Sequence, residues 1–230
     1  MVKVVKFGGS SLASAEQFAK VGNIIRMDES RKFVVPSAPG KRNSKDTKVT
    51  DMLYGCYALA DAEKDFSAEL DAIKARYPDL PLIDVVNEAI PGHQPAPYKE
   101  ALGGDGKTGY DWIIKAFEMA YERWPDAILI YNDYNTFQWQ RTEFINLVKV
   151  LRDAGAPIDA YGCQSHDLTG MNFTDFKSAM TEIQNALKMP MYSTEYDIGT
   201  TDDNLQLQRY KEQIHYMWEA AYCAGITLWG

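Results

Sequence analysis

The feature of this sequence that most constrains its fold is a regular alternation of short apolar runs and longer amphipathic stretches, which starts at residue 82. Short apolar runs predict buried strands, and apolar residues at helical spacing predict helices between them. We expect strands at 82–87, 127–131, 159–163, 191–194 and 226–229, and helices at 110–123, 140–154, 173–187 and 204–224. Repeated strand–helix units of this length require parallel strands, so the sequence predicts an α/β fold.

Polar or aromatic residues follow nearly every one of these strands. They are Asn87-Glu88, Asn132 to Asn135, Gln164 to His166, Glu195 to Asp197, and Trp229. Unusual residues at several successive strand ends are typical of one face of a (β/α) barrel, whereas an open sheet concentrates its site at one switch point. The sequence therefore favours TIM-barrel-like packing for residues 81–230.

Residues 1–80 differ from the rest of the chain in charge and in aromatic content. They hold 13 Lys and Arg against 11 Asp and Glu, net +2, whereas residues 81–230 hold 11 against 21, net −10. All five Trp residues lie in the second part. In the first part we expect a strand at 2–7, a helix at 13–26, a second strand from residue 33, a helix from about residue 50 and a helical stretch over 56–78. The sequence therefore predicts two segments, 1–80 and 81–230.

Charge and composition argue against several classes of partner. The formal charge of −8 argues against a nucleic-acid-binding surface and against an anionic membrane partner. Cys56, Cys163 and Cys223 lack metal-ligand spacing and are expected to be reduced core thiols. The N-terminal apolar run is too short for a secretion signal or a membrane span, so we expect a cytoplasmic protein or one stripped of its signal, and assign no compartment.

Two glutamates, Glu88 and Glu195, end separate predicted strands among amide and aromatic residues. Hydrolysis of a glycosidic bond suits this set, because one carboxyl acts as acid, the other as nucleophile or base, and aromatic faces and amides bind the sugar. Metal binding fits less well, since His166 has no i+4 partner and no nearby Cys, and we expect no cofactor. Spacing alone leaves an alternative open, in which Glu195 and Asp197 cap the next helix or lie in solvent.

The first segment carries a resemblance to a known family. Lys6-Phe7-Gly8-Gly9-Ser10-Ser11, Val34 to Gly40 and Thr50-Asp51-Met52-Leu53 resemble the opening of an aspartate kinase of the amino-acid kinase family. The resemblance covers roughly residues 1–78 and implies that ATP phosphates are bound by Lys6, Gly8, Gly9 and Ser10. We find no later nucleotide-binding half in the sequence, so a complete kinase is not expected.

The second segment carries a more extensive resemblance. Asp84 to Ala89, Tyr131 to Asn135, Gly162 to His166, Thr194 to Ile198 and Gly225 to Gly230 resemble, in order and spacing, the second half of glycoside hydrolase family ten, the endo-β-1,4-xylanases. The resemblance implies a retaining enzyme with an eight-fold (β/α) barrel, acting on xylan or xylo-oligosaccharide. It implies that Glu88 is the acid/base, Glu195 the nucleophile and His166 the partner of the nucleophile. The sugar next to the cleaved bond would be contacted by Asn87, Tyr134, Gln164 and Trp229.

The sequence departs from that family at its front, where a kinase-like segment stands in place of three strand–helix units. Two arrangements are open. In the one we favour, the kinase-like βαβα units replace the front of the barrel; in the other, two partial domains adjoin and the second has an open five-stranded sheet. Two strands in the first segment and five in the second make seven, one short of an eight-stranded barrel. The expected function is a xylanase-type glycosidase, possibly impaired; a kinase-type phosphotransferase fragment and an inactive scaffold are the alternatives.

Overall fold

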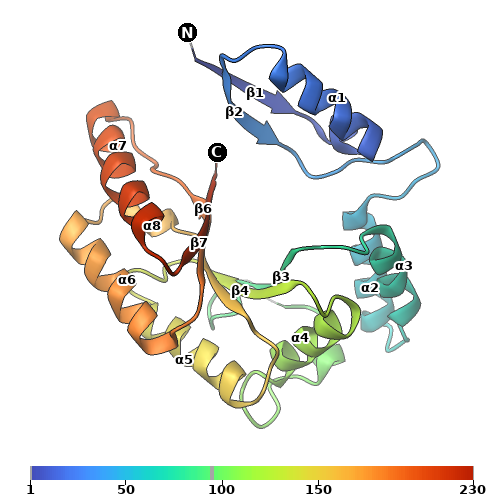
Figure 1. Ribbon diagram of the computed structural model, residues 1–230. Coiled ribbons are helices and arrows are strands. Elements are labelled where there is room, and N and C mark those ends of the chain that lie inside the picture. The colour runs from blue at the N-terminus through green and yellow to red at the C-terminus, as the bar shows by residue number, and fades with distance from the viewer. Residues whose placement is uncertain (1, 94–95, 230) are drawn as a thin grey trace. The chain divides into compact units, whose positions relative to one another are not determined.

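The computed structural model of the protein describes residues 2–93 and 96–229 (Figure 1). The chain divides into two compact units, Met1–Ile73 and Lys74–Gly230, and each is described by itself. Within the described ranges, no helix is both long and apolar enough to cross a membrane.

The first unit is built around two parallel strands. β1 (Lys3–Phe7) pairs with β2 (Arg31–Pro36), and the connection between them contains the 3-10 helix η1 (Gly9–Leu12) and α1 (Ala15–Arg26). α1 begins after Ser14, because the side-chain oxygen of Ser14 accepts a hydrogen bond from the backbone amide of Gln17. α2 (Val49–Asp61) follows, and α3 (Ser67–Arg76) crosses the boundary between the units.

The second unit contains a five-stranded parallel sheet in the order β3-β4-β5-β6-β7. Its strands are β3 (Leu82–Asn87), β4 (Ile128–Asp133), β5 (Ala160–Cys163), β6 (Met191–Tyr196) and β7 (Cys223–Leu228). Its helices are η2 (Glu100–Leu102), α4 (Asp111–Arg123), α5 (Arg141–Asp153), η3 (His166–Leu168), α6 (Phe173–Leu187), α7 (Asp203–Arg209), the π-helical turn η4 (Tyr210–Ile214) and α8 (His215–Glu219). Each of the strands β3 to β6 is joined to the next strand through helical residues, as parallel pairing requires.

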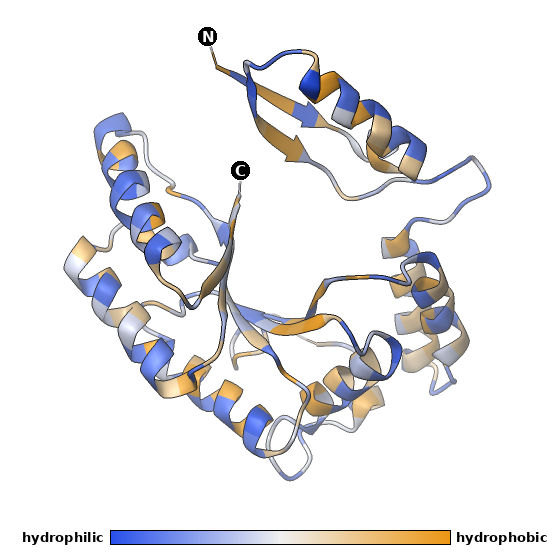
Figure 2. Ribbon diagram, viewed as in Figure 1, coloured by the Kyte–Doolittle hydropathy of each residue, from blue (hydrophilic) through white to orange (hydrophobic). Residues whose placement is uncertain are grey.

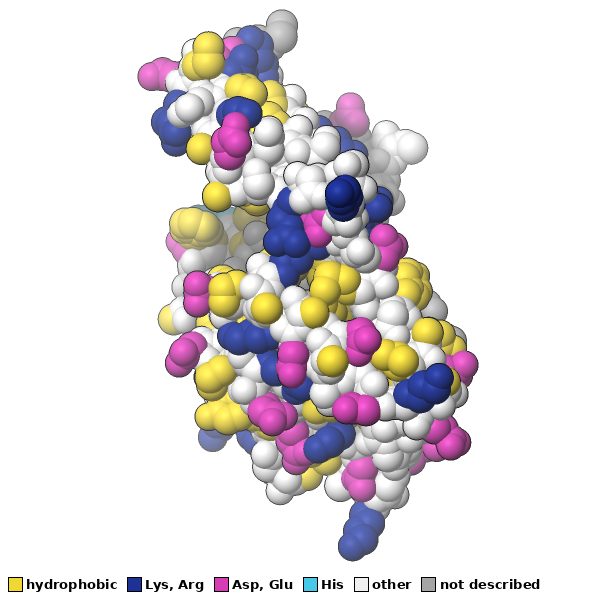
Figure 3. All heavy atoms as spheres, turned by 90° about the vertical axis from the view of Figure 1, so that its right-hand side faces the viewer, with side chains coloured by type: hydrophobic (Ala, Val, Ile, Leu, Met, Phe, Trp, Pro, Cys, Tyr) yellow, Lys and Arg dark blue, Asp and Glu magenta, His cyan; other side chains and the backbone are white. Residues whose placement is uncertain are grey.

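The core of the second unit lies around β4 and β5. In β4 every residue after Ile128 is buried, and all four residues of β5 are buried. α5 covers these strands with an apolar side on which Phe144, Leu147, Val148 and Leu151 are completely buried. Full burial of such a side chain contributes roughly 1.5–3 kcal/mol. Figure 2 shows hydrophobic residues on strands and helices alike, alternating with hydrophilic ones along the helices, and acidic, basic and apolar side chains are interspersed on the face shown in Figure 3.

The strands of the described ranges form two separate sheets, β1-β2 and β3-β4-β5-β6-β7. Their number, seven, is the number expected from the sequence. β1 and β2 pair with each other, and β3 and β7 are the edges of the five-stranded sheet. The favoured arrangement, with the kinase-like strands at the front of a barrel, stays a prediction.

Two helices expected from the sequence are interrupted. The stretch expected at 56–78 is divided between α2 and α3, and Glu63 between them has a φ of 54°, a conformation that a right-handed helix cannot contain. The helix expected at 204–224 ends at Glu219. β7 begins at Cys223 instead of residue 226, because Cys223 already pairs with Met191 of β6.

Candidate active site

The ends of neighbouring strands bring polar side chains into one row across the five-stranded sheet. Asn132 of β4 lies between Asn87 of β3 and Gly162 of β5 in the register of the sheet. Position 162 suits glycine, because a Cβ there would lie 2.5 Å from Asn132 Oδ1 and 3.0 Å from Thr194 Cγ2. The missing side chain at position 162 therefore makes room for the Asn132 amide.

Three residues that follow these strands have a left-handed backbone, which is uncommon outside glycine. Glu88 follows β3 with a φ of 61°, Asn135 follows β4 with 56°, and Ser165 follows β5 with 73°. Each such conformation costs on the order of 1–3 kcal/mol, and they cluster at functional sites. The strained positions thus coincide with the strand ends that the sequence singles out.

Three side-chain amides, those of Gln164, Asn87 and Asn132, connect Glu88 with Glu195. Gln164 Nε2 donates to Glu88 Oε1 at 2.8 Å and to Asn87 Oδ1 at 3.1 Å. Asn132 Nδ2 donates to the same Asn87 oxygen at 3.0 Å and to Glu195 Oε1 at 3.4 Å. Asn132 is completely buried and Gln164 is 2% exposed, so both amides are withdrawn from water. The structure therefore brings four of the expected site residues, Asn87, Glu88, Gln164 and Glu195, into one hydrogen-bonded group.

His166 lies between two carboxylates. Its Nε2 is 3.4 Å from Glu195 Oε2, and its Nδ1 is 2.8 Å from Asp197 Oδ1. The hydrogen bond between Nδ1 and Asp197 fixes the orientation of the ring, and so the direction in which Nε2 faces Glu195. Asp197 was expected among the polar residues at the strand ends, or as a cap or solvent-exposed residue, and the structure places it beside His166.

Trp229, expected at the sugar site, follows β7 and lies edge-on to His166, with ring centroids 6.3 Å apart and planes at 73°. Its side chain is 57% exposed, and its backbone amide donates to the Tyr196 carbonyl at 2.9 Å. Trp229 is therefore anchored at its backbone, and its ring is open to solvent.

Tyr134, also expected at the sugar site, follows β4 and stacks on the His93 ring, with centroids 3.7 Å apart and planes at 11°. Desolvation, and then the negative charges of Glu88 and Asp133, raise the pKa of Tyr134 above its usual value. The phenol is therefore within electrostatic reach of Glu88.

His93 and Asp133 form a polar cluster that the sequence analysis did not predict. Asp133 is completely buried, and one of its oxygens lies 2.5 Å from His93 Nδ1. Burial raises the pKa of Asp133, against the lowering effects of its hydrogen bond with Tyr131 and of the His93 charge. Asp133 could have been found from the sequence, because it is an acid at the end of an expected strand. Nothing in the sequence pattern marks His93, which lies 40 residues away from it.

Asp84 of β3 belongs to the same electrostatic environment. Desolvation and the negative charge of Glu195 raise the pKa of Asp84 to about 7, and a hydrogen bond with Asn132 lowers it by a smaller amount. The residue lies on the exposed edge strand β3. In the described ranges no group of three or more His, Cys, Asp or Glu side chains could hold a metal ion.

The kinase-like candidates lie in the first unit, at the end of β1. Lys6, Gly8 and Ser10 are exposed there. The backbone of Gly9 touches that of Gly40, whose amide donates to the Gly9 carbonyl at 2.8 Å, and a Cβ on Gly9 would lie 2.7 Å from the Ala38 carbonyl oxygen. Gly9 and Gly40 therefore allow two loops to meet, a role that does not extend to Gly8.

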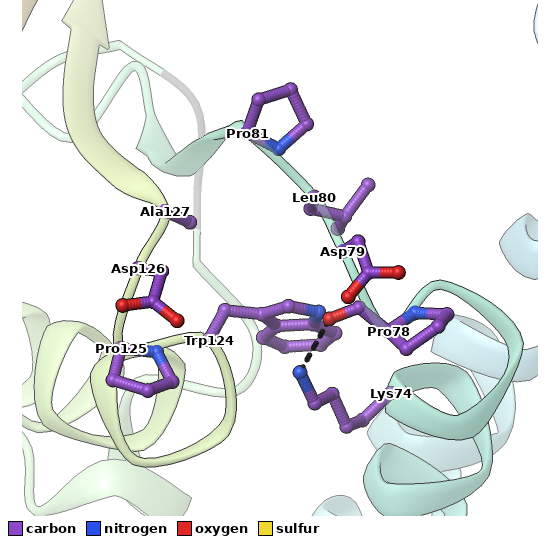
Figure 4. Close-up of a pocket in the computed structure, with 9 residues that line it drawn as sticks. All are labelled: Lys74, Pro78, Asp79, Leu80, Pro81, Trp124, Pro125, Asp126 and Ala127. Carbon is purple, nitrogen blue, oxygen red and sulfur yellow. Dashed lines mark hydrogen bonds between the residues drawn. The ribbon is translucent and has the colours of Figure 1, made fainter.

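A pocket of about 230 Å³ lies in the second unit beside the starts of β3 and β4, the ends opposite the glutamates (Figure 4). Lys74 Nζ donates to the Pro78 carbonyl at 2.6 Å and lies 5.5 Å from the centre of the Trp124 ring. The Trp124 indole N–H donates to the Tyr77 carbonyl at 2.7 Å. The Lys74 ammonium and the Trp124 indole are therefore both bonded to backbone carbonyls, and none of the expected site residues lines the pocket.

A parallel sheet with two glutamates at separate strand ends, joined by amides, is the arrangement expected of a glycoside hydrolase. The sequence profile of glycosyl hydrolase family 10 matches residues 48–230. The chain therefore belongs to glycosyl hydrolase family 10.

Three comparisons with known proteins describe the likeness. Endo-1,4-beta-xylanase B of Cellvibrio japonicus (strain Ueda107) is 46% identical over 156 residues, which cover 68% of this chain and 25% of that protein. Aspartokinase 3 of Bacillus subtilis (strain 168) is 62% identical over 55 residues, 24% of this chain and 12% of that one. The structure of a thermostable mutant of the xylanase Xyn10A from Cellvibrio japonicus is similar with a TM-score of 0.59 at 26% identity, over 72% of this chain and 59% of that chain.

The chain thus spans only part of the xylanases that it matches. Both resemblances inferred from the sequence are found, the kinase-like one over 55 residues where roughly 78 were expected.

Proposed function

We propose that this protein is a retaining glycoside hydrolase that cleaves β-1,4-xylosidic bonds, with Glu88 as acid/base and Glu195 as nucleophile. One observation carries the proposal: the two glutamates end separate strands and are joined through Gln164, Asn87 and Asn132. The substrate class is supported by the 46% identity with an endo-1,4-beta-xylanase.

The proposed reaction has two steps. In the first, Glu195 attacks the anomeric carbon while Glu88 gives its proton to the leaving oxygen, so that the C–O bond breaks and a glycosyl ester forms. In the second, Glu88 takes a proton from water, which attacks the same carbon and releases Glu195. His166, held by Asp197, orients the Glu195 carboxylate in both steps. The mechanism requires the two carboxyl groups to lie about 5–5.5 Å apart.

The sugar next to the cleaved bond would stack on Trp229 and contact Asn87, Gln164 and Tyr134. Trp229 offers an exposed ring for stacking. The sequence has a kinase-like segment where the family has three further strand–helix units, so we expect fewer contacts to the sugars that those units hold. Because contacts remote from the bond also lower the barrier, we expect turnover to be slow.

Hydrolysis of an activated aryl β-xyloside tests the proposal. We expect release of the aryl alcohol by the intact chain, a β-configured first product by NMR, and loss of release in Glu195→Ala. The control is Glu118→Ala, which changes an exposed glutamate of α4 that pairs with Lys115. Equal rates for the intact chain and Glu195→Ala would refute the proposal, and xylo-oligosaccharide binding without product would favour an inactive scaffold.

A second proposal concerns the first unit, where Lys6, Gly8, Gly9 and Ser10 would bind the phosphates of ATP. It is supported by the 62% identity with aspartokinase 3 over 55 residues. Calorimetric titration with ATP tests it, with Lys6→Ala as the variant and Lys3→Ala, which loses only a surface pair with Asp28, as the control. Absence of ATP binding would remove this proposal and leave the glycosidase proposal unaffected.

A further inference from the structure

We propose that His93 is a positioning residue for Glu88: together with Asp133 it clamps the loop that follows β3 to the end of β4 and so holds the Glu88 carboxyl in place for proton transfer. This inference rests on the proposed function, in which Glu88 is the acid/base. It is carried by the contacts of a buried carboxylate, a buried imidazole and three consecutive backbone amides.

The carboxylate of Asp133 is the centre of the clamp. One oxygen lies 2.5 Å from His93 Nδ1 and accepts from the Tyr134 amide at 2.8 Å. The other accepts from the Ile90 amide at 3.1 Å and from the Tyr131 hydroxyl. Four partners on a carboxylate with no solvent exposure make a fully satisfied, rigid junction.

The backbone around Glu88 is held by the end of β4. The amide of Glu88 donates to the Asn132 carbonyl at 3.0 Å, and the next amide, that of Ala89, donates to the Tyr131 hydroxyl at 3.3 Å. The third, that of Ile90, donates to Asp133. The φ of Glu88 is 61°, a strained conformation that a free loop would leave. The three hydrogen bonds therefore hold the residue in this conformation.

His93 ties the far side of this loop to two further segments. Its Nε2 lies 2.5 Å from Gln140 Oε1, which also accepts from Asn135 Nδ2 at 2.9 Å, and its ring stacks on Tyr134. The His93 side chain is 4% exposed. One ring therefore connects the loop after β3, the end of β4 and the residue that precedes α5.

A histidine that only stabilises the core would, when changed, lower stability without selecting one chemical step. If His93 positions the acid, its substitution should instead slow selectively the reactions that need the proton of Glu88. Departure of a sugar alkoxide needs the proton of Glu88, whereas departure of dinitrophenolate does not, so the two leaving groups separate the roles.

The first experiment compares these leaving groups in His93→Gln and His93→Ala. We expect kcat/KM for a xylo-oligosaccharide to fall by about 10- to 100-fold, because misplacing a reacting group by about 1 Å has an effect of this size. The pre-steady-state burst of dinitrophenolate from a dinitrophenyl β-xyloside should change by less than about threefold, because this leaving group departs without the proton of Glu88. Equal losses on both substrates, or no loss on either, would overturn the proposal.

The second experiment does not need activity and uses hydrogen exchange of the Ile90 amide. We expect its protection to fall in both His93 variants and to be unchanged in His215→Gln, which alters an exposed histidine of α8. Unchanged protection in the His93 variants would overturn the clamp whatever the turnover. If the intact chain hydrolyses neither substrate, the proposed function fails, and the exchange result alone decides on the clamp.

Discussion

His166 lies closer to Asp197 than to Glu195, at 2.8 Å against 3.4 Å. Asp197, which has no proposed bond to the sugar, therefore anchors the imidazole. The other ring nitrogen faces Glu195, the proposed nucleophile. The side chains of His166 and Asp197 are 33% and 35% exposed, so the pair is open to the solvent that a substrate would displace.

Asp197→Asn is expected to slow formation of the glycosyl ester. The amide keeps the shape of the side chain but loses the charge that orients the ring, and a misoriented group can cost about 10²-fold in rate. The measurement is the burst rate with a dinitrophenyl β-xyloside. Asp203→Asn, at an exposed site in the first turn of α7, is the control and should leave the rate unchanged. An unchanged rate in Asp197→Asn would mean that His166 is oriented without it.

Gly162→Ala is expected to destabilise the fold and disturb the amide row. The new Cβ would lie 2.5 Å from Asn132 Oδ1, and Asn132 is completely buried between strands, so it cannot move away freely. Overpacking of this kind costs about 1–3 kcal/mol. Urea unfolding measures the loss, with Gly170→Ala as the control because a Cβ there meets nothing within 4 Å. Equal effects of the two substitutions would contradict the packing argument.

Trp229→Ala is expected to weaken binding of a xylo-oligosaccharide with little effect on stability. The ring is 57% exposed, so its removal leaves no core cavity, but it takes away the proposed stacking surface beside His166. Titration calorimetry should show the loss. Trp218→Ala is the control, because Trp218 is 81% exposed on α8 and has no proposed role. Similar affinities in all three proteins would remove Trp229 from the site.

Asp167→Asn is expected to change how stability depends on pH. Burial raises the pKa of Asp167 from its usual 3.8 to about 6, and among the described residues its Oδ1 has no hydrogen-bond partner. Because the folded pKa lies above the unfolded one, the folded state binds the proton more tightly. Stability from this group is then greatest below about pH 4 and is lost as the pH rises to about 6, by about 3 kcal/mol.

The free energy of unfolding at pH 4.5 and 7.5 tests this expectation. Relative to the intact chain, Asp167→Asn should gain stability at pH 7.5 and gain less at pH 4.5. Asp153→Asn, an exposed position at the end of α5, should follow the intact chain at both values. Parallel profiles for Asp167→Asn and the intact chain would show that burial of this carboxyl is not costly.

Most strands of the second unit could be predicted from the sequence, because buried parallel strands are continuous apolar runs; β4 is the clearest case. Helix ends were less predictable. Cys223 and Ala224 extend the amphipathic pattern of the helix before them, yet β7 begins at Cys223 because pairing with β6 outweighs the local pattern. The division into a two-stranded and a five-stranded sheet was one of two arrangements that the sequence left open, since strand pairing is decided by contacts distant in sequence.

The grouping of candidate side chains was predictable where a residue type and a strand end coincide, as at Glu88, Gln164 and Glu195. It was not predictable where a side chain acts through a partner that only folding supplies. His93 has no periodicity around it, and its carboxylate partner lies 40 residues away on another strand. Asp197 was visible as an acid, but its contact with His166 depends on the turn after β5, which begins at the left-handed Ser165.

The left-handed backbone of Glu88 means that position 88 is better suited to glycine than to an acid. Glycine reaches a φ of 61° without steric cost, so Glu88→Gly would relieve strain while deleting the proposed proton donor. A library of this protein screened only for resistance to heat or protease would therefore tolerate, and could enrich, chains that have lost their chemistry. Directed evolution for stability would therefore also need a selection for turnover, so that a glutamate is kept at position 88.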